Sequence, residues 1–237
     1  MSAAPTPAPS PLSALLAGLQ LTDSAFPSGR YTLSHGLEGY LQAKQVDQQS
    51  MPELLADLLR HSVGPADATA LALAHRAAEA GDFAAVAEVD QRLLASKLNR
   101  ELRQACVRTG RQLLDTAQLA LQSPLLDRYA ELVAAKVAPG CQPVAAGVAY
   151  AAGGVSAEQA VASDLFAFAV SFTGAALRLR LTDHRRAQST LRATAPVITE
   201  VTAAALGREL ADLGGFAPIA DAMSARHERA EARLFAT

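Results

Sequence analysis

The chain has 237 residues, of which half are hydrophobic, with few aromatic residues, no Trp and a net charge of −2. This length accommodates one large domain or two small ones, and a core built from Leu, Val and Ala favours helices. A near-neutral charge without a concentrated block of Lys and Arg argues against a nucleic-acid-binding protein.

The N-terminal segment alternates Pro and Ala, and it predicts a flexible extended arm over residues 1–11. It has no charged region followed by an apolar one, so we do not expect a secretory signal. The most apolar run, Leu165–Leu177, is shorter than the roughly 20 residues of a membrane span and is predicted to be a core helix. Residues 12–237 are predicted to form a single-domain, all-α bundle of roughly nine or ten helices.

Apolar residues at helical spacing predict the helices, and Pro and Gly mark their ends. The first is a short amphipathic helix with Leu12, Leu15, Leu16 and Leu19 on one face, followed by a turn over Asp23–Gly29. No run alternates for long enough to demand a strand. The remaining predicted helices cover residues 32–43, 50–62, 67–80, 82–95, 99–121, 124–137, 143–152, 156–181, 185–213 and 217–234.

Four local signals refine these boundaries. Ser50 with Glu53, and Ser156 with Gln159, have the spacing of capping boxes at helix N-termini. Gly64-Pro65 is expected to stop one helix, and Pro196 is expected to kink or split another.

The residue types that bind metals or catalyse reactions do not form a recognisable pattern. No two of the histidines His35, His61, His75, His184 and His227 have the spacing of a metal-binding helix, so only a weak site shared with a partner stays open. Cys106 and Cys141 form no CxxC pair and are interpreted as buried thiols in a reducing cytoplasm. Ser34 beside His35 lacks an orienting acid and a nucleophile elbow, and no phosphate-binding loop is present. We therefore predict no catalytic residue, no metal site and no cofactor.

The stretch DSAFPSGRYTLSHGLEGYL, residues 23–41, contains more polar residues than a turn needs. A turn accounts for Phe26 as a core residue, for Pro27 and for Gly29 at a positive φ. The remaining bulky polar groups are of the kind found in recognition surfaces, namely Arg30, Tyr31, Ser34, His35 and Glu38.

Two further stretches leave alternatives open. Arg100, Arg103, Arg108 and Arg111 share a predicted helix with an apolar stripe, and they form either a solvated basic face or a patch for an acidic partner. In the tail SARHERAEARLFAT, residues i and i+4 on the predicted helix pair His227 with Glu231 and Arg229 with Arg233, as on a solvated face. The terminal Leu234-Phe235 either docks on its own core or is presented to another chain.

Four stretches in this order resemble the urease accessory protein UreF family. They are the opening segment LLAGLQLTDSAFPSGRYTLSHGLE, the Arg-rich SKLNRELRQACVRTGRQLL, the long QPVAAGVAY segment through Gln188, and the closing PIADAMSARHERAEARLFAT. The last includes Arg226-His227-Glu228 and Arg233-Leu234-Phe235 on the family pattern. Arg30 and Tyr31 depart from it, because family members often have a second Gly and a Phe there.

The resemblance implies a cytoplasmic, all-helical scaffold that is not an enzyme. Such proteins form a dimer, bind the accessory protein UreD (also called UreH) and recruit the GTPase UreG, and the assembly delivers nickel to apo-urease. An unrelated helical adaptor and a helical metal-binding enzyme are the alternatives. By this resemblance the residues expected to shape or contact a partner surface are Phe26, Pro27, Gly29, Arg30, His35, Glu38, Arg226, His227, Glu228, Arg233, Leu234 and Phe235.

Overall fold

The computed structural model of the chain describes residues 10–27 and 29–236. The arm predicted over residues 1–11 lies outside the described residues, except for Ser10 and Pro11. Pro11 is the first residue of the first helix, and the Ser10 side chain caps that helix by accepting a hydrogen bond from the Ser13 amide at 3.2 Å.

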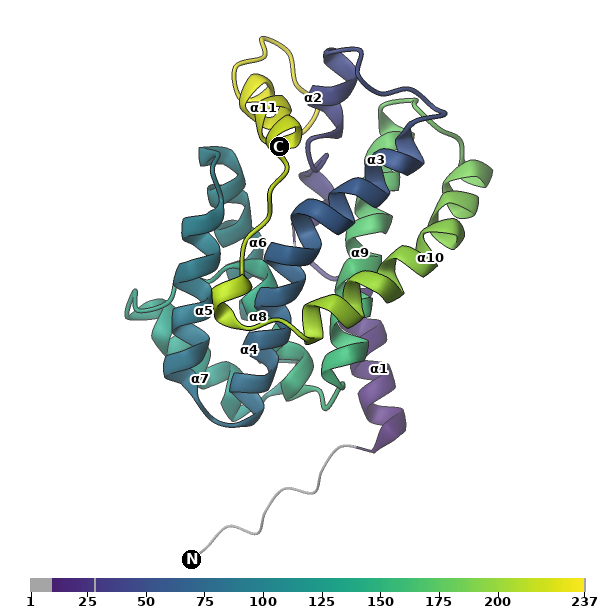
Figure 1. Cartoon of the computed structure of the whole chain (residues 1–237). Helices are drawn as coiled ribbons and strands as arrows, with labels where there is room; N and C mark the ends of the chain where they lie inside the picture. The colour runs from purple at the N-terminus through teal and green to yellow at the C-terminus, as the bar shows by residue number, and fades with distance from the viewer. Residues whose placement is uncertain (1–9, 28, 237) are drawn as a thin grey trace, which may run out of the picture.

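The described residues contain helices and no strands, which confirms the all-α prediction. Helices α3 and α4 are joined without interruption by a π-helix, so the eleven α-helices form ten rods, in line with the predicted number (Figure 1). The elements are α1 Pro11–Thr22, η1 Arg30–Thr32, α2 Leu37–Gln42, α3 Met51–Leu58, η2 Leu59–Ala68, α4 Thr69–Glu79, α5 Phe83–Ser96, α6 Arg100–Leu121, α7 Pro124–Ala134, α8 Gln142–Ala152, α9 Ala157–Arg178, α10 His184–Leu206, η3 Leu210–Asp212 and α11 Pro218–His227.

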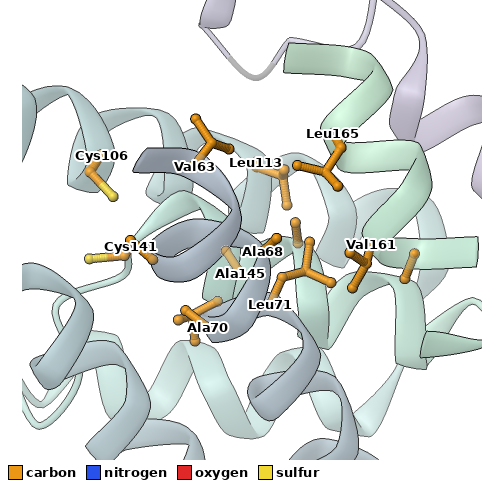
Figure 2. Close-up of a cluster of buried hydrophobic side chains, with 14 of the residues drawn as sticks. Val63, Ala68, Ala70, Leu71, Cys106, Leu113, Cys141, Ala145, Val161 and Leu165 are labelled. Carbon is orange, nitrogen blue, oxygen red and sulfur yellow. The ribbon is translucent and has the colours of Figure 1, made fainter. Parts of the chain in front are cut away.

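Helix α8 lies at the centre of the bundle, and its most extensive packing is against α4 and α6. Every residue from Gln142 to Tyr150 is buried, as expected for a helix that is apolar on all sides. Figure 2 shows the neighbouring core, where Leu71 of α4, Leu113 of α6, Ala145 of α8 and Leu165 of α9 meet. Several of these positions are alanines, which let the helices approach closely.

Helix α9 packs against α10 along one side of this core. By length and composition alone, α9 is the one described helix that is long and apolar enough to cross a membrane. Half of its most apolar window is buried inside the fold, including Leu165 and Phe172, in agreement with the predicted core helix.

The prediction that Gly64-Pro65 stops a helix is wrong. The chain passes through this point as the π-helix η2, and the missing Pro65 amide leaves a carbonyl group of the preceding turn without its helical donor. His61 O, four residues before Pro65, accepts instead from the Phe216 amide at 3.0 Å in the segment between α10 and α11, and the nearby Pro65 O accepts from the Gly214 amide of the same segment at 3.1 Å. A long-range contact therefore compensates for the proline.

Of the two outcomes predicted for Pro196, a kinked or a split helix, the split does not occur, because α10 is continuous from His184 to Leu206 with Pro196 inside it. Pro196 lies on the exposed face of α10, where water can bond the carbonyl group that lacks its helical donor. The predicted capping box at Ser50 does not form, since the Ser50 hydroxyl and amide both donate to Asp47 Oδ1. Ser156 does cap its helix, accepting from the Gln159 amide at 3.3 Å.

Candidate functional site

The N-terminal segment and the C-terminal tail meet at one end of the bundle, where α11 packs on α2 (Figure 1). Gly39 allows this close packing. A Cβ atom at this position would lie 2.6 Å from the Met223 carbonyl oxygen of α11, well inside van der Waals contact. We call the residues from η1, α2, α11 and the tail that meet here the terminal cluster.

The carboxylate of Glu38 is the centre of the terminal cluster. It accepts hydrogen bonds from His227 Nε2 at 2.8 Å, from the Leu234 amide at 2.8 Å and from the Phe235 amide at 3.0 Å. The residues Glu38 and His227 are only 6% and 1% exposed. A buried carboxylate needs several donors to offset its desolvation, and here the end of α11 supplies one and the tail supplies two.

Other contacts fix the tail to α6 and η1. Glu228 Oε1 accepts from the Glu101 amide at 2.8 Å, in the first turn of α6, where the Asn99 side chain provides no cap. A carboxylate at a helix N-terminus is favoured by the helix dipole. Arg233 forms a 2.6 Å ion pair with the Glu101 side chain, and the Ala236 amide donates to Thr32 O at 2.9 Å.

Phe235 is buried against a cation from α9. The Arg178 guanidinium carbon lies 4.3 Å from the Phe235 ring centroid and 4.0 Å from the Tyr31 ring centroid, so the guanidinium contacts both rings. Arg178 also donates to Tyr31 O at 2.6 Å. Tyr31 and Leu234 themselves are 73% and 63% exposed, so they are the large side chains of the cluster that another protein can reach.

Arg30 and His35 point into the fold. Arg30 forms a 2.6 Å ion pair with Asp164, which also accepts from Gln142 Nε2 at 3.0 Å. His35 Nε2 lies 2.9 Å from Ser171 Oγ, and its ring is 4.5 Å from that of Phe168. Burial, followed by the positive charges of Arg30 and Arg178, lowers the pKa of His35 to about 3, so its imidazole is neutral at physiological pH.

Two cavities adjoin this region, and both are lined by Arg30, Gln142 and Asp164. The larger, of about 800 Å³, lies beside the turn that contains Phe26. The smaller, of about 410 Å³, extends from Leu33 toward the start of α6. Gly29, at φ 75°, has the positive φ predicted for this turn, and Phe26 is buried as predicted.

The structure therefore brings most of the sequence-predicted residues together. They differ in how far each is exposed to solvent. Four are buried, four are partly buried and four are exposed. The buried residues are Phe26, Glu38, His227 and Phe235, the partly buried ones are Gly29, Arg30, His35 and Glu228, and the exposed ones are Pro27, Arg226, Arg233 and Leu234.

The prediction of a final helix to Leu234 is wrong, because α11 ends at His227. The i, i+4 pairs predicted within residues 227–233 therefore do not form. The tail amides instead bond to Glu38. Of the alternatives for the terminal dipeptide, Phe235 docks on its own chain, while Leu234 is exposed and its presentation to another chain stays a prediction.

Sequence reasoning missed Glu101, Asp164 and Arg178 as members of this region. Each contacts a partner more than 130 positions away in the chain, and no local pattern marks such a pair. Such long-range contacts of charged side chains can be recognised only once the packing of the helices is known.

The geometry of the described residues supports neither a metal-binding site nor a reactive thiol. Across residues 10–27 and 29–236, no three His, Cys, Asp or Glu side chains are grouped to hold a metal ion. Cys106 and Cys141 are free, buried and near each other (Figure 2). A hydrogen bond with Cys106, together with burial, raises the pKa of Cys141, which keeps that thiol protonated.

Comparison with known proteins gives one consistent result. The sequence model of the UreF family matches residues 46–195. The chain is 32% identical to urease accessory protein UreF 2 of Brucella canis over 229 residues, covering 94% of this chain and 92% of that protein. It is 32% identical to urease accessory protein UreF of Trichodesmium erythraeum over 231 residues, covering 96% and 98%. It is 34% identical to the protein of the same name from Xanthobacter autotrophicus over 229 residues, covering 96% and 93%.

Proposed function

The chain belongs to the UreF family of urease accessory proteins, which are not enzymes, and from this we propose that it is a scaffold for urease maturation. In this proposal it binds a UreD/UreH-type protein and recruits or modulates a UreG-type GTPase. The assembly then inserts nickel into apo-urease in the cytoplasm. Neither a nucleic acid nor a membrane is a partner, and the chain supplies no catalytic residue.

The observation that supports this proposal best is the way the tail is held. Residues 228–236 are not helical, yet they are fixed by the buried Glu38 carboxylate and by the Arg178 guanidinium. A tail that is ordered in this way presents Leu234 beside the exposed Tyr31. Exposed aromatic and aliphatic side chains on a rigid support are typical of the energetic centre of protein interfaces.

The predicted partner-binding residues take two different roles in this proposal. Leu234, Arg226 and Pro27 are exposed and contact the UreD/UreH-type protein directly. The buried residues, above all Glu38, His227 and Phe235, hold the surface in shape. Arg30 and His35 support the same segment from below, through Asp164 and Ser171.

We also propose that the scaffold is a homodimer and that α1 lies at its interface. Helix α1 has no charged residue and no buried residue, and Leu12, Leu15, Leu16 and Leu19 are exposed along one face. A second copy suits this face because two uncharged leucine stripes can pack around a two-fold axis without leaving a charge unpaired. A highly charged partner surface would find nothing to pair with there.

Co-purification from a urease-producing host tests the scaffold. The tag belongs at the N-terminus, because the C-terminal tail is docked. Gel filtration with mass detection should then recover UreD/UreH-type and UreG-type proteins with more than one copy of the chain. A lone monomer with stoichiometric nickel, iron or zinc would contradict the proposal and favour a metal-binding enzyme, and a stable complex with proteins unrelated to urease would favour a different adaptor.

Removal of residues 233–237 tests the docking role of the tail. Helix content should not change, because the last helix ends at His227, while binding of the UreD/UreH-type protein should weaken. Leu119→Ser, which alters an exposed leucine of α6, is the control. If the truncated chain binds as well as this control, the tail is not part of the interface.

A further inference from the structure

A second exposed surface lies where the α5–α6 connection meets the start of α11. Leu98, Phe216 and Ile219 are 67%, 84% and 63% exposed, and the exposed Arg100 and Arg103 lie in the first turn of α6, just after Leu98. We call these five residues the apolar–arginine surface, and we propose that it binds an acidic amphipathic segment of a partner protein.

The apolar part of this surface opens onto a cavity. Leu98 and Phe216 line the cavity of about 410 Å³, whose walls include Leu58, Val63 and Leu102. Asn99 Nδ2 donates to Asp221 O at 3.1 Å, which fixes the connection beside α11. Large aliphatic side chains of a ligand therefore have both an exposed rim and an apolar space to enter.

Phe216 is held in place although its side chain is exposed. Its amide donates to His61 O at 3.0 Å, and the nearby Gly214 amide donates to Pro65 O at 3.1 Å. Gly215 lies so close to η2 that a Cβ atom there would be 2.9 Å from Ser62 O. A rigid backbone that presents an exposed phenylalanine loses little entropy when a ligand covers the ring.

The charge next to the apolar part is positive and uncompensated. Arg100, Arg103, Arg108 and Arg111 lie on the exposed face of α6, and none of them forms an ion pair within the described part of the chain. Two of the neighbouring acids already have partners, since Glu101 pairs with Arg233 and Asp67 pairs with Lys97, while Asp221 lines the cavity itself. This arrangement favours a partner with carboxylates at its margin.

The exposed apolar residues, the cavity and the arginines together favour a segment of a protein as the ligand. Leu98 and Ile219 are aliphatic, and Leu58, Val63 and Leu102 form an apolar part of the cavity wall, which suits leucine or isoleucine side chains better than nucleic-acid bases. An amphipathic helix supplies these side chains on one face and carboxylates beside them. The sequence left open whether the arginines of α6 are a solvated face or a patch for an acidic partner, and this geometry favours the patch.

Fluorescence anisotropy with the full chain and three labelled peptides tests the proposal. Each peptide has about 18 residues, enough for an amphipathic helix. The first combines Leu on one face with Glu on the other, the second replaces Glu by Lys, and the third replaces Leu by Ser. The Leu/Glu peptide should bind tightest, and added salt should weaken its binding.

Two variants localise the binding, each with a matched control. Phe216→Ser removes the exposed ring, and Arg100→Glu reverses a charge that makes no hydrogen bond or ion pair among the described residues. Each should weaken binding of the Leu/Glu peptide by about tenfold. Leu119→Ser and Arg192→Glu make the same kinds of change on exposed parts of α6 and α10, and they should leave binding unchanged.

Three outcomes would overturn the proposal: equal affinity for all three peptides, no difference between the variants and their controls, or tighter binding of a single-stranded oligonucleotide that is lost in Phe216→Ser. The last outcome would assign the surface to nucleic acid. No urease component enters the experiment, so its failure leaves the scaffold proposal untouched.

Discussion

His227 Nε2 donates a 2.8 Å hydrogen bond to the carboxylate of Glu38, which lies 189 positions earlier in the chain. Both side chains are buried, and the same carboxylate accepts from the amides of Leu234 and Phe235. One buried charge thus joins α2, the end of α11 and the tail. The position of the exposed Leu234 depends on a residue that a partner cannot reach.

Glu38→Gln should release the tail. The amide keeps the size of the side chain but offers one acceptor oxygen and places an NH₂ group opposite donors. We expect the free energy of unfolding to fall by about 2–4 kcal/mol, because buried donors lose a charged acceptor. Urea unfolding measures the loss, and limited trypsin digestion with mass spectrometry should detect faster cleavage after Arg229 and Arg233.

Glu53→Gln is the matched control, since it makes the same change at an exposed position in the first turn of α3. It should change stability by less than about 0.5 kcal/mol and leave tail cleavage unchanged. Equal cleavage rates in Glu38→Gln and Glu53→Gln would show that the Glu38 carboxylate does not hold the tail.

Neighbouring residues of the tail should separate stability from partner binding. Phe235→Ala removes a buried ring that packs on Arg178, and it should lower the free energy of unfolding by about 3 kcal/mol. Leu234→Ser alters an exposed side chain and should change stability by less than about 0.5 kcal/mol, yet weaken binding of the UreD/UreH-type protein. Thermal unfolding and co-purification measure the two effects, and unchanged binding by Leu234→Ser would exclude that side chain from the interface.

The lowered pKa of His35 predicts that the free energy of unfolding depends on pH. Its pKa is about 3 in the folded chain and 6.5 without the fold, so the unfolded chain binds more protons between these values. The stabilising effect is complete above pH 6.5 and is lost as the pH falls through this window, with a slope of up to about 1.4 kcal/mol per pH unit. Urea midpoints measured from pH 7.5 to pH 4 should show it.

His35→Asn isolates this contribution, because Asn does not titrate and tolerates the positive φ of 55° at this position. The variant should be less stable at pH 7.5 and should lose less stability than the parent chain on acidification. Parallel pH profiles for the two proteins would show that His35 is not the group responsible.

Composition and periodicity were sufficient to predict the helical class and most helix positions. The two wrong helix breaks share one physical reason, since a proline costs little where its free carbonyl finds another donor. At Pro65 the donor is the Phe216 amide, and at Pro196 the carbonyl faces the exposed side of the helix, where water can bond it. Neither the contact of the α10–α11 segment with η2 nor the exposure of Pro196 can be predicted from the residues next to each proline.

Several members of the terminal cluster were predictable from the sequence, but its geometry was not. The sequence marked Glu38, His227 and Phe235 as unusual, yet their mutual contact depends on Gly39 letting α11 approach α2. The local pattern extended the last helix to Leu234, because helical spacing cannot reveal that a distant carboxylate competes for the tail amides. Arg178 had no signal beyond ending an apolar run.

The exposed leucines of α1 predict a loss of self-association on mutation. Leu15→Ser with Leu16→Ser should convert a dimer to a monomer while leaving the fold intact, because α1 packs on the bundle through Ala17, Gly18 and Leu21. Gel filtration with light scattering measures the mass, and Leu119→Ser controls for loss of an exposed leucine elsewhere. A dimer that survives the double substitution would move the interface to another face.

Two glycines in helices provide the sharpest comparison of packing at the candidate site. Gly39→Ala places a methyl group 2.6 Å from Met223 O, so α11 must shift away from α2, and the free energy of unfolding should fall by about 1–3 kcal/mol. Gly174→Ala, in α9, meets no atom within 4 Å and should raise stability by about 0.5–1 kcal/mol through lower backbone entropy of the unfolded chain. Because α11 leads into the tail, trypsin should cleave after Arg229 and Arg233 faster in Gly39→Ala alone. If the two substitutions change stability and cleavage alike, the contact of α2 with α11 is not what orders the tail.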